Sequence, residues 1–139
     1  MSNKLLLILC LGTFPLIANA EWIQYAKSTK SSFEIYYSSA SIKTDGGYKT
    51  VTILKNFNEP QEFTAEKPFF KFLSSVETQS IDCEKKVYRG TRTEKWSELW
   101  GKGKLGKSYD YVGAKKQAWS EPIKITQIEG VLMEKVCPQ

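Results

Sequence analysis

Aromatic and β-branched residues alternate with polar ones along most of the chain, in the two-residue period of β-strands. Runs of this kind predict strands at residues 21–27, 33–37, 48–57, 75–83, 87–96 and 108–112. The pair Asp45-Gly46 between two runs indicates a hairpin, because both central residues of a type I′ turn need positive φ. The stretch from Asn58 to Pro68 holds two prolines and little periodicity, so we expect a surface connection there.

The last segment changes to the period of a helix. Its apolar residues fall on one helical face, and these are Ile128, Val131, Leu132 and Val136. Thr126 and Glu129 fit a capping box, which predicts the start of the helix. Gly130 lowers the helix propensity by about 1 kcal/mol relative to alanine, so tertiary packing must hold this helix. The sum predicts an α+β fold: a single antiparallel β-sheet of about five or six strands with a C-terminal helix on one face.

The first twenty residues read as an export signal. Lys4 precedes the apolar run of residues 5–11, and Ala18-Asn19-Ala20 stands directly before Glu21, which predicts cleavage after Ala20 and one domain over residues 21–139. The alternative is a membrane anchor, but Pro15 interrupts a run that is shorter than the roughly 20 apolar residues of a bilayer span. Removing Lys4 leaves 19 basic residues against 15 acidic ones, a net charge of +4 that serves solubility.

The three cysteines differ in their expected roles. Cys10 follows Leu9 instead of the small residue that lipid modification needs, so we expect no lipid anchor and a protein that is periplasmic, on the cell surface or secreted. Cys83 and Cys137 remain, and an even count in an oxidising compartment predicts a disulfide. A closed loop of about 55 residues would stabilise the fold by about 4 kcal/mol on the chain-entropy model. The alternative is a pair of buried free thiols.

The composition excludes most catalytic chemistry. The chain has no histidine, which rules out Ser-His-Asp and Cys-His arrangements, His-containing zinc sites and haem held by histidine. Glu59, Glu62 and Glu66 are close in sequence, but they lie in a predicted flexible connection and not in the rigid setting that a catalytic pair needs. No calcium loop is present. We therefore predict no catalytic residues, no metal site, no cofactor and no enzymatic activity.

A stretch of glycines, lysines and aromatic residues is the one suggestive binding feature. The spacing of Gly101, Gly103 and Gly106 matches the dinucleotide fingerprint, but it lies between two predicted strands and is interpreted as a glycine-rich hairpin loop. The candidate binding residues are Trp96, Trp100, Lys102, Lys104 and Lys107, followed by Tyr109 and Tyr111. Such a mixture on a mobile loop can bind a protein or an anionic glycan. The alternative is that the aromatic residues belong to the sheet and the lysines keep a loop soluble. Nucleic acid is not an expected partner in this compartment.

Motifs spread over the whole domain carry a resemblance to a known family. They are Trp22, Tyr36-Tyr37 with Ala40-Ser41-Ile42, Val51 to Leu54, Ser74-Ser75, Ile81-Asp82-Cys83, Trp119-x-x-Pro122, Thr126-x-x-Glu129 and Cys137. Taken together, the chain resembles the surface-adhesin protein E family of small exported Gram-negative proteins. The resemblance implies an antiparallel sheet, a C-terminal helix tethered by a Cys83–Cys137 disulfide, and an adhesive role toward host extracellular-matrix or serum proteins. The second hypothesis is a soluble periplasmic accessory or inhibitor protein that acts on an envelope partner.

Overall fold

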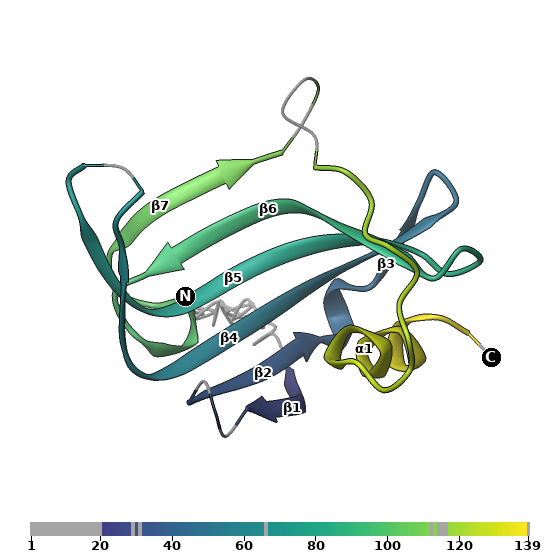
Figure 1. The fold of residues 1–139 in the computed structure, drawn as a ribbon, viewed down its shortest axis with the longest axis horizontal. Coiled ribbons are helices and arrows are strands. Elements are labelled where there is room, and N and C mark those ends of the chain that lie inside the picture. The colour runs from purple at the N-terminus through teal and green to yellow at the C-terminus, as the bar shows by residue number, and fades with distance from the viewer. Residues whose placement is uncertain are drawn as a thin grey trace, which may run out of the picture.

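The computed structural model describes residues 21–28, 30, 32–65, 67–111, 113 and 117–138, and it forms one curved sheet with a helix on one face (Figure 1). The predicted signal peptide lies outside the described residues. The elements are β1 (Trp22–Ser28), β2 (Phe33–Ser38), β3 (Lys43–Asp45), β4 (Tyr48–Phe63), β5 (Phe70–Asp82), β6 (Val87–Trp96), β7 (Leu105–Asp110) and α1 (Ile128–Val136), with short 3-10 turns at Ser39–Ser41 and Leu99–Gly101. Within these ranges no helix is long and apolar enough to span a bilayer.

The strands form a meander in which neighbours are antiparallel. The order is β1-β2-β4-β5-β6-β7, and the short β3 pairs with the beginning of β4. This confirms the predicted fold class of one antiparallel sheet with a C-terminal helix. The β3–β4 hairpin differs by one residue from the prediction: Asp45 still pairs with Tyr48, so Gly46 and Gly47, at φ 55° and 85°, are the central residues of the turn.

The prediction of a surface connection from Asn58 to Pro68 is wrong for its first half. β4 continues to Phe63, so Glu59 and Glu62 lie on a strand, whereas Glu66 is outside the described residues. The register shifts between Asn56 and Gln61, and this irregularity takes up Pro60. Proline lacks an amide donor and is confined to edges and bulges of a sheet, so the bulge accommodates it without ending the strand.

The predicted strand at residues 108–112 is displaced along the chain. β7 runs over Leu105–Asp110 and pairs with β6, with Leu105 opposite Trp96 and Asp110 opposite Arg92. Val112 lies outside the described residues. Glycine inside a strand is unfavourable, which is why the glycine-rich start of β7 reads as loop from the sequence. Pairing with β6 overrides that preference.

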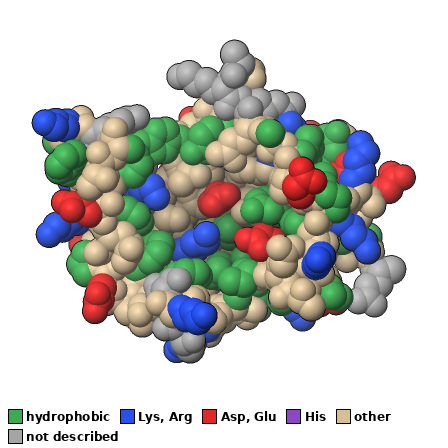
Figure 2. Space-filling view, in the orientation of Figure 1, with side chains coloured by type: hydrophobic (Ala, Val, Ile, Leu, Met, Phe, Trp, Pro, Cys, Tyr) green, Lys and Arg blue, Asp and Glu red, His purple; other side chains and the backbone are tan. Residues whose placement is uncertain are grey.

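The main core lies between the sheet and α1. The strands contribute Tyr37, Val51, Ile53 and Ile81, and the helix contributes Leu132, Met133 and Val136, all at most 8% exposed. Only part of this sheet face carries the helix (Figure 1). Beside the helix the same face is hollowed, and both basic and acidic side chains lie in the hollow (Figure 2).

The helix begins later than the capping box predicts. α1 starts at Ile128 with Gln127 as its N-cap, and no side chain caps it, so the predicted Thr126–Glu129 capping box is wrong. The Gln127 side chain instead accepts a hydrogen bond from the Lys124 amide at 2.8 Å and closes the turn before the helix. Leu132 and Val136 are buried as predicted, but Ile128 is 36% exposed.

Gly130 is buried because the segment before the helix passes directly over it. A Cβ at this position would overlap the Lys124 carbonyl oxygen and would lie 2.7 Å from the Ile125 Cα. We therefore expect Gly130→Ala to lower the free energy of unfolding by about 2 kcal/mol through overpacking against backbone. Helix propensity alone would give a gain of about 1 kcal/mol. Urea denaturation measures the sign, with the exposed helix change Glu134→Ala as a control, and a stabilised Gly130→Ala protein would contradict this packing.

The disulfide is formed as predicted from the cysteine count and the family resemblance. Cys83, directly after β5, is bonded to Cys137, which follows α1, and their Cα atoms are 5.7 Å apart. The bond spans 54 residues of sequence. Because both cysteines pack against the helix core, the bond ties the end of α1 to the centre of the chain.

Candidate functional site

The connection between β6 and β7, residues 97–104, is the candidate site from the sequence, and it is internally hydrogen-bonded. The Ser97 amide donates to the Lys104 carbonyl at 3.0 Å, and the Glu98 amide donates to the Lys102 carbonyl at 3.2 Å. The Ser97 hydroxyl oxygen also accepts from the Lys104 amide at 2.8 Å. Its glycines join two antiparallel strands, as the sequence indicated. These bonds join the two ends of the loop, and the mobility expected from the sequence stays a prediction.

The loop folds back onto the sheet face opposite α1, where buried polar residues bind it. The Ser74 hydroxyl donates to the Glu98 carbonyl at 2.5 Å and accepts from the Gly101 amide at 3.0 Å. Asn56 accepts from the Trp100 amide at 2.9 Å. Ser74 is 0% exposed and Asn56 is 6% exposed. Buried polar groups need partners, so the loop and these two strand residues satisfy one another.

Trp100 is displayed on this loop. Its backbone is left-handed, with φ 64°, a conformation that costs a non-glycine residue free energy, and its side chain is 41% exposed. The indole ring packs on Tyr36, with ring centroids 4.8 Å apart. The Tyr36 hydroxyl in turn donates to Glu34 at 2.8 Å, and burial together with this carboxylate raises the pKa of Tyr36 to about 12. The hydrogen bonds from Tyr36 and then Lys27 lower the pKa of Glu34.

Trp96 lies under the loop, and its contacts indicate a structural role. A Cβ added to Gly101 would lie 4.0 Å from the Trp96 ring, so the loop backbone passes close over it. Its indole N–H donates to the Glu94 carboxylate at 3.2 Å, and Arg92 binds the other oxygen of that carboxylate at 2.6 Å. Trp96 is half-buried, and a packed indole usually finds a hydrogen-bond partner for its N–H in this way.

The three predicted lysines are not all together. Lys102 and Lys104 are exposed on the loop, near Trp100. Lys107 pairs in register with Lys95, which neighbours Trp96 along β6 and therefore points to the other face of the sheet. The structure thus groups Trp96, Trp100, Lys102 and Lys104 on one side and puts Lys107 on the helix side. The binding role of all five residues stays a prediction.

The sequence reasoning missed two apolar residues, Leu99 within the loop and Leu105 directly after it. Leu99 and Leu105 are both 40% exposed, next to Trp100 and the two loop lysines. The signal in the sequence was the position of these leucines next to glycines and lysines, where a loop and hence exposure are expected. Large exposed apolar side chains with a rim of lysines are typical of protein-binding surfaces. We name Leu99, Trp100, Lys102, Lys104 and Leu105 the loop surface.

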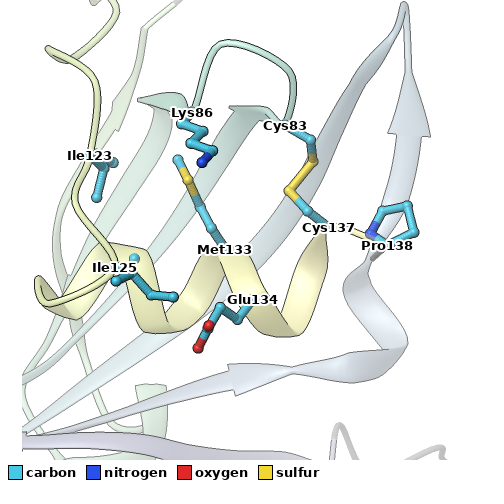
Figure 3. Close-up of a pocket in the computed structure, with 9 residues that line it drawn as sticks. Cys83, Lys86, Ile123, Ile125, Met133, Glu134, Cys137 and Pro138 are labelled. Atoms are coloured by element: carbon cyan, nitrogen blue, oxygen red, sulfur yellow. A yellow bond between two sulfur atoms is a disulfide. The ribbon is translucent and has the colours of Figure 1, made fainter.

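A pocket of about 390 Å³ lies at the end of α1, against the disulfide (Figure 3). Met133 on the helix and Lys86 on the β5–β6 turn point toward one another, and Ile123 and Ile125 lie on the other side. Its lining is apolar apart from Lys86 and Glu134. Small-molecule sites combine an apolar lining with a few convergent polar groups, so this pocket suits an apolar group better than a polar ligand.

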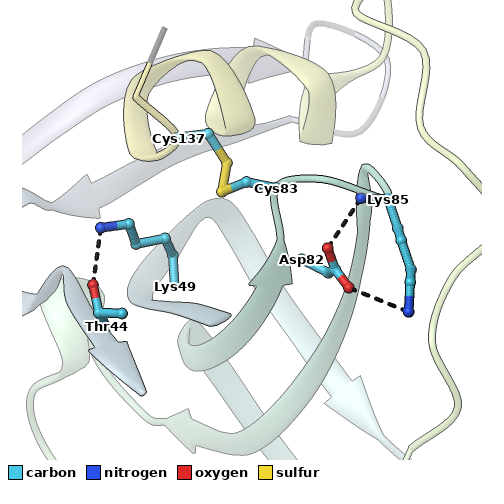
Figure 4. Close-up of a disulfide and its surroundings, with 6 residues drawn as sticks. All are labelled: Thr44, Lys49, Asp82, Cys83, Lys85 and Cys137. Atoms are coloured by element: carbon cyan, nitrogen blue, oxygen red, sulfur yellow. Dashed lines mark hydrogen bonds and ion pairs between the residues drawn. A yellow bond between two sulfur atoms is a disulfide. The ribbon is translucent and has the colours of Figure 1, made fainter. Parts of the chain in front are cut away.

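Asp82 and Lys85 stabilise the turn beside the disulfide (Figure 4). Asp82 accepts from the Lys85 amide at 3.0 Å and pairs with the Lys85 ammonium at 3.8 Å. An aspartate that bonds the amide three residues later is a typical turn device, so these groups have a structural role. Among the residues that the structure describes, no three Asp, Glu or Cys side chains gather in a way that could hold a metal ion.

Comparisons with known proteins agree with this architecture. A family model described as surface-adhesin protein E matches residues 22–138. The fold is similar to the structure of Haemophilus influenzae protein E, with a TM-score of 0.59, 18% sequence identity, and coverage of 84% of this chain and 83% of that one. Protein E from non-typeable Haemophilus influenzae gives a TM-score of 0.59 at 17% identity, covering 88% of this chain and 79% of that one. A search of curated protein sequences gives no match.

Proposed function

The chain belongs to the surface-adhesin protein E family, and from that premise we propose that it is an exported, non-enzymatic binding module that uses its loop surface to attach to host extracellular-matrix or serum proteins. The family match over residues 22–138 supports an adhesive protein. The single observation that carries the choice of surface is the display of Trp100, 41% exposed on a hydrogen-bonded loop. A loop that is already ordered loses little conformational entropy on binding.

The composition of the loop surface fits a protein partner. Tryptophan is the residue type most enriched among binding hot spots, and leucines beside it exclude water from the contact. Lys102 and Lys104 would steer an acidic partner and add salt-dependent association. The absence of histidine from the sequence and the exposed positions of Glu59 and Glu62 support a protein without catalysis.

A Trp100→Gly variant tests the loop surface. Glycine accepts the positive φ at this position, so the substitution removes the indole without straining the loop. We expect binding to an immobilised basement-membrane extract or to immobilised serum proteins to weaken about 30-fold, the effect of losing a hot-spot tryptophan. Surface plasmon resonance with the purified exported protein measures this change.

The matched controls are Phe69→Ala, which removes another exposed aromatic ring, and Lys43→Gln/Lys85→Gln, which removes two exposed lysines away from the loop. Both should bind like the wild-type protein. Equal losses in Trp100→Gly and Phe69→Ala would contradict the loop as the binding surface. Protease treatment of intact cells tests the location: complete protection inside the outer membrane would exclude direct adhesion and favour the periplasmic accessory role.

A further inference from the structure

A row of lysines crosses the sheet on the face that carries α1. The register places Lys55 of β4 opposite Ser75 of β5, Ser75 opposite Lys95 of β6, and Lys95 opposite Lys107 of β7. Directly paired residues in a sheet point to the same side. Lys55 follows Val51 and Ile53 in steps of two, and those residues contact α1, so the row lies on the helix side. We name Lys55, Lys95 and Lys107 the lysine row.

The charges alone disfavour three lysines at one level of the sheet. Like charges directly across strands destabilise a sheet, and Lys95 and Lys107 are such a pair. In the described part of the chain, neither Lys55 nor Lys95 forms an ion pair. Half-burial, and then the charge of Lys55, lower the pKa of Lys95, while Glu77 acts in the opposite direction. Unfavourable charge arrangements of this kind are typical of functional sites.

Aromatic rings hold the ammonium groups in place. The Lys95 ammonium lies 4.2 Å from the centre of the Phe72 ring, and the ammonium groups of Lys95 and Lys107 lie 5.9 and 5.8 Å from that of Phe63. Lys55 lies 6.0 Å from the centre of the Phe33 ring. Cation–π contacts direct a lysine without neutralising its charge. The row is therefore a preorganised set of positive charges.

We propose that the lysine row is a second binding site, on the face opposite the loop surface, and that it binds a linear sulfated polysaccharide. The strands are about 4.8 Å apart, so the row presents positive charges along a line perpendicular to them. The row lies on the helix side of the sheet, which is the side that Figure 2 shows. At this level β5 contributes Ser75 and no lysine, so the charges stand on β4, β6 and β7, and a flexible chain that carries sulfates along its length can follow such a line.

An acidic peptide fits the row less well. Peptides recognised by sheets add as a strand to an edge and use main-chain hydrogen bonds. The row runs over the middle strands β4, β5 and β6, whose main-chain groups already pair on both sides, so only its end at β7 meets an edge. Recognition here must come from side-chain charge. Lysine ammonium groups bind sulfate and phosphate oxygens as point charges and need no planar, bidentate partner.

The test compares Lys55→Gln/Lys95→Gln/Lys107→Gln with Lys43→Gln/Lys85→Gln/Lys124→Gln, which removes the same charge from exposed lysines elsewhere. Heparin is the probe, and its affinity for the purified exported protein is measured at several NaCl concentrations. If each lysine contact changes the heparin affinity about threefold, the variant that lacks all three lysines should bind heparin about 30-fold more weakly than wild type. The slope of log Kd against log salt should fall by roughly 2, as for other linear polyanions. The control should keep both the affinity and the slope.

Several outcomes would overturn the proposal. They are equal losses in the two triple variants, wild-type binding to dextran as strong as to heparin, and polyglutamate binding as tight as heparin binding. If the row variant does not fold, Lys55→Gln/Lys107→Gln retains the Lys95 contacts and should still weaken heparin binding about tenfold. The Trp100→Gly variant should keep its heparin affinity. The two proposals can therefore be contradicted independently, because heparin binding tests the lysine row and protein binding tests the loop surface.

Discussion

The Cys83→Ser/Cys137→Ser variant should lose about 4 kcal/mol of unfolding free energy, because the wild-type bond closes a separation of 54 residues and restricts the unfolded chain. In a domain of this size that loss lowers Tm by about 15 °C. Calorimetry or urea denaturation of the two proteins measures the difference. The wild-type protein treated with a reducing agent should match the variant.

The consequence of this change should be greatest at α1. A nine-residue helix is too short to be stable alone, and without the bond only packing holds it to the sheet. Amide hydrogen exchange should therefore accelerate more at residues 128–136 than in β4 or β5. A loss below about 1 kcal/mol would mean that the unfolded chain is already restricted without the bond, contrary to the chain-entropy account.

Leu132→Ala should lower the free energy of unfolding by about 3 kcal/mol. Leu132 is 1% exposed and packs with Val51, Ile53 and Ile81, so its truncation leaves a cavity between α1 and the sheet. Urea denaturation at constant protein concentration gives the change. The disulfide remains in this variant and prevents the helix from separating completely, so the protein should still unfold in one transition.

Ile128→Ala is the matched control, because Ile128 is in the same helix and is 36% exposed. It should cost less than about 1 kcal/mol. If the two substitutions cost the same, the helix would bury a different face from the one described. The helical period of apolar residues predicts equal burial for Ile128 and Leu132. The two substitutions therefore test whether the structure or the sequence pattern gives the correct burial.

The strands were predictable because each is a local pattern. Alternation of apolar and polar residues locates β1, β2 and β6 within one residue at each boundary, and glycine pairs or charged turns mark their ends. The end of β5 is also located within one residue, but β5 begins at Phe70 and not at Ser75 as predicted. The second half of β4 was not predictable in this way. Pro60 and the surrounding glutamates have a low strand propensity, and only pairing with β5 around a bulge keeps them in the sheet.

The candidate site was predictable only in part. A loop rich in glycine, lysine and tryptophan is visible in the sequence, and so is its position between two strands. The sequence does not reveal that Lys107 is separated from Lys102 and Lys104, because this separation depends on where the loop ends and β7 begins. A shift of one residue in register moves a side chain to the opposite face of a sheet.

Local patterns and residue types alone predicted most of the strands, the C-terminal helix, the cysteine pair and the family resemblance. Tertiary contacts were needed to show that Ser74 and Asn56 hold the loop surface, that backbone passes over Gly130, and that three distant lysines form a row. The loop contacts and the lysine row join residues far apart in the chain, and the contact over Gly130 depends on how the segment before α1 folds back on the helix. Register and packing set them, and neither is encoded in any single segment.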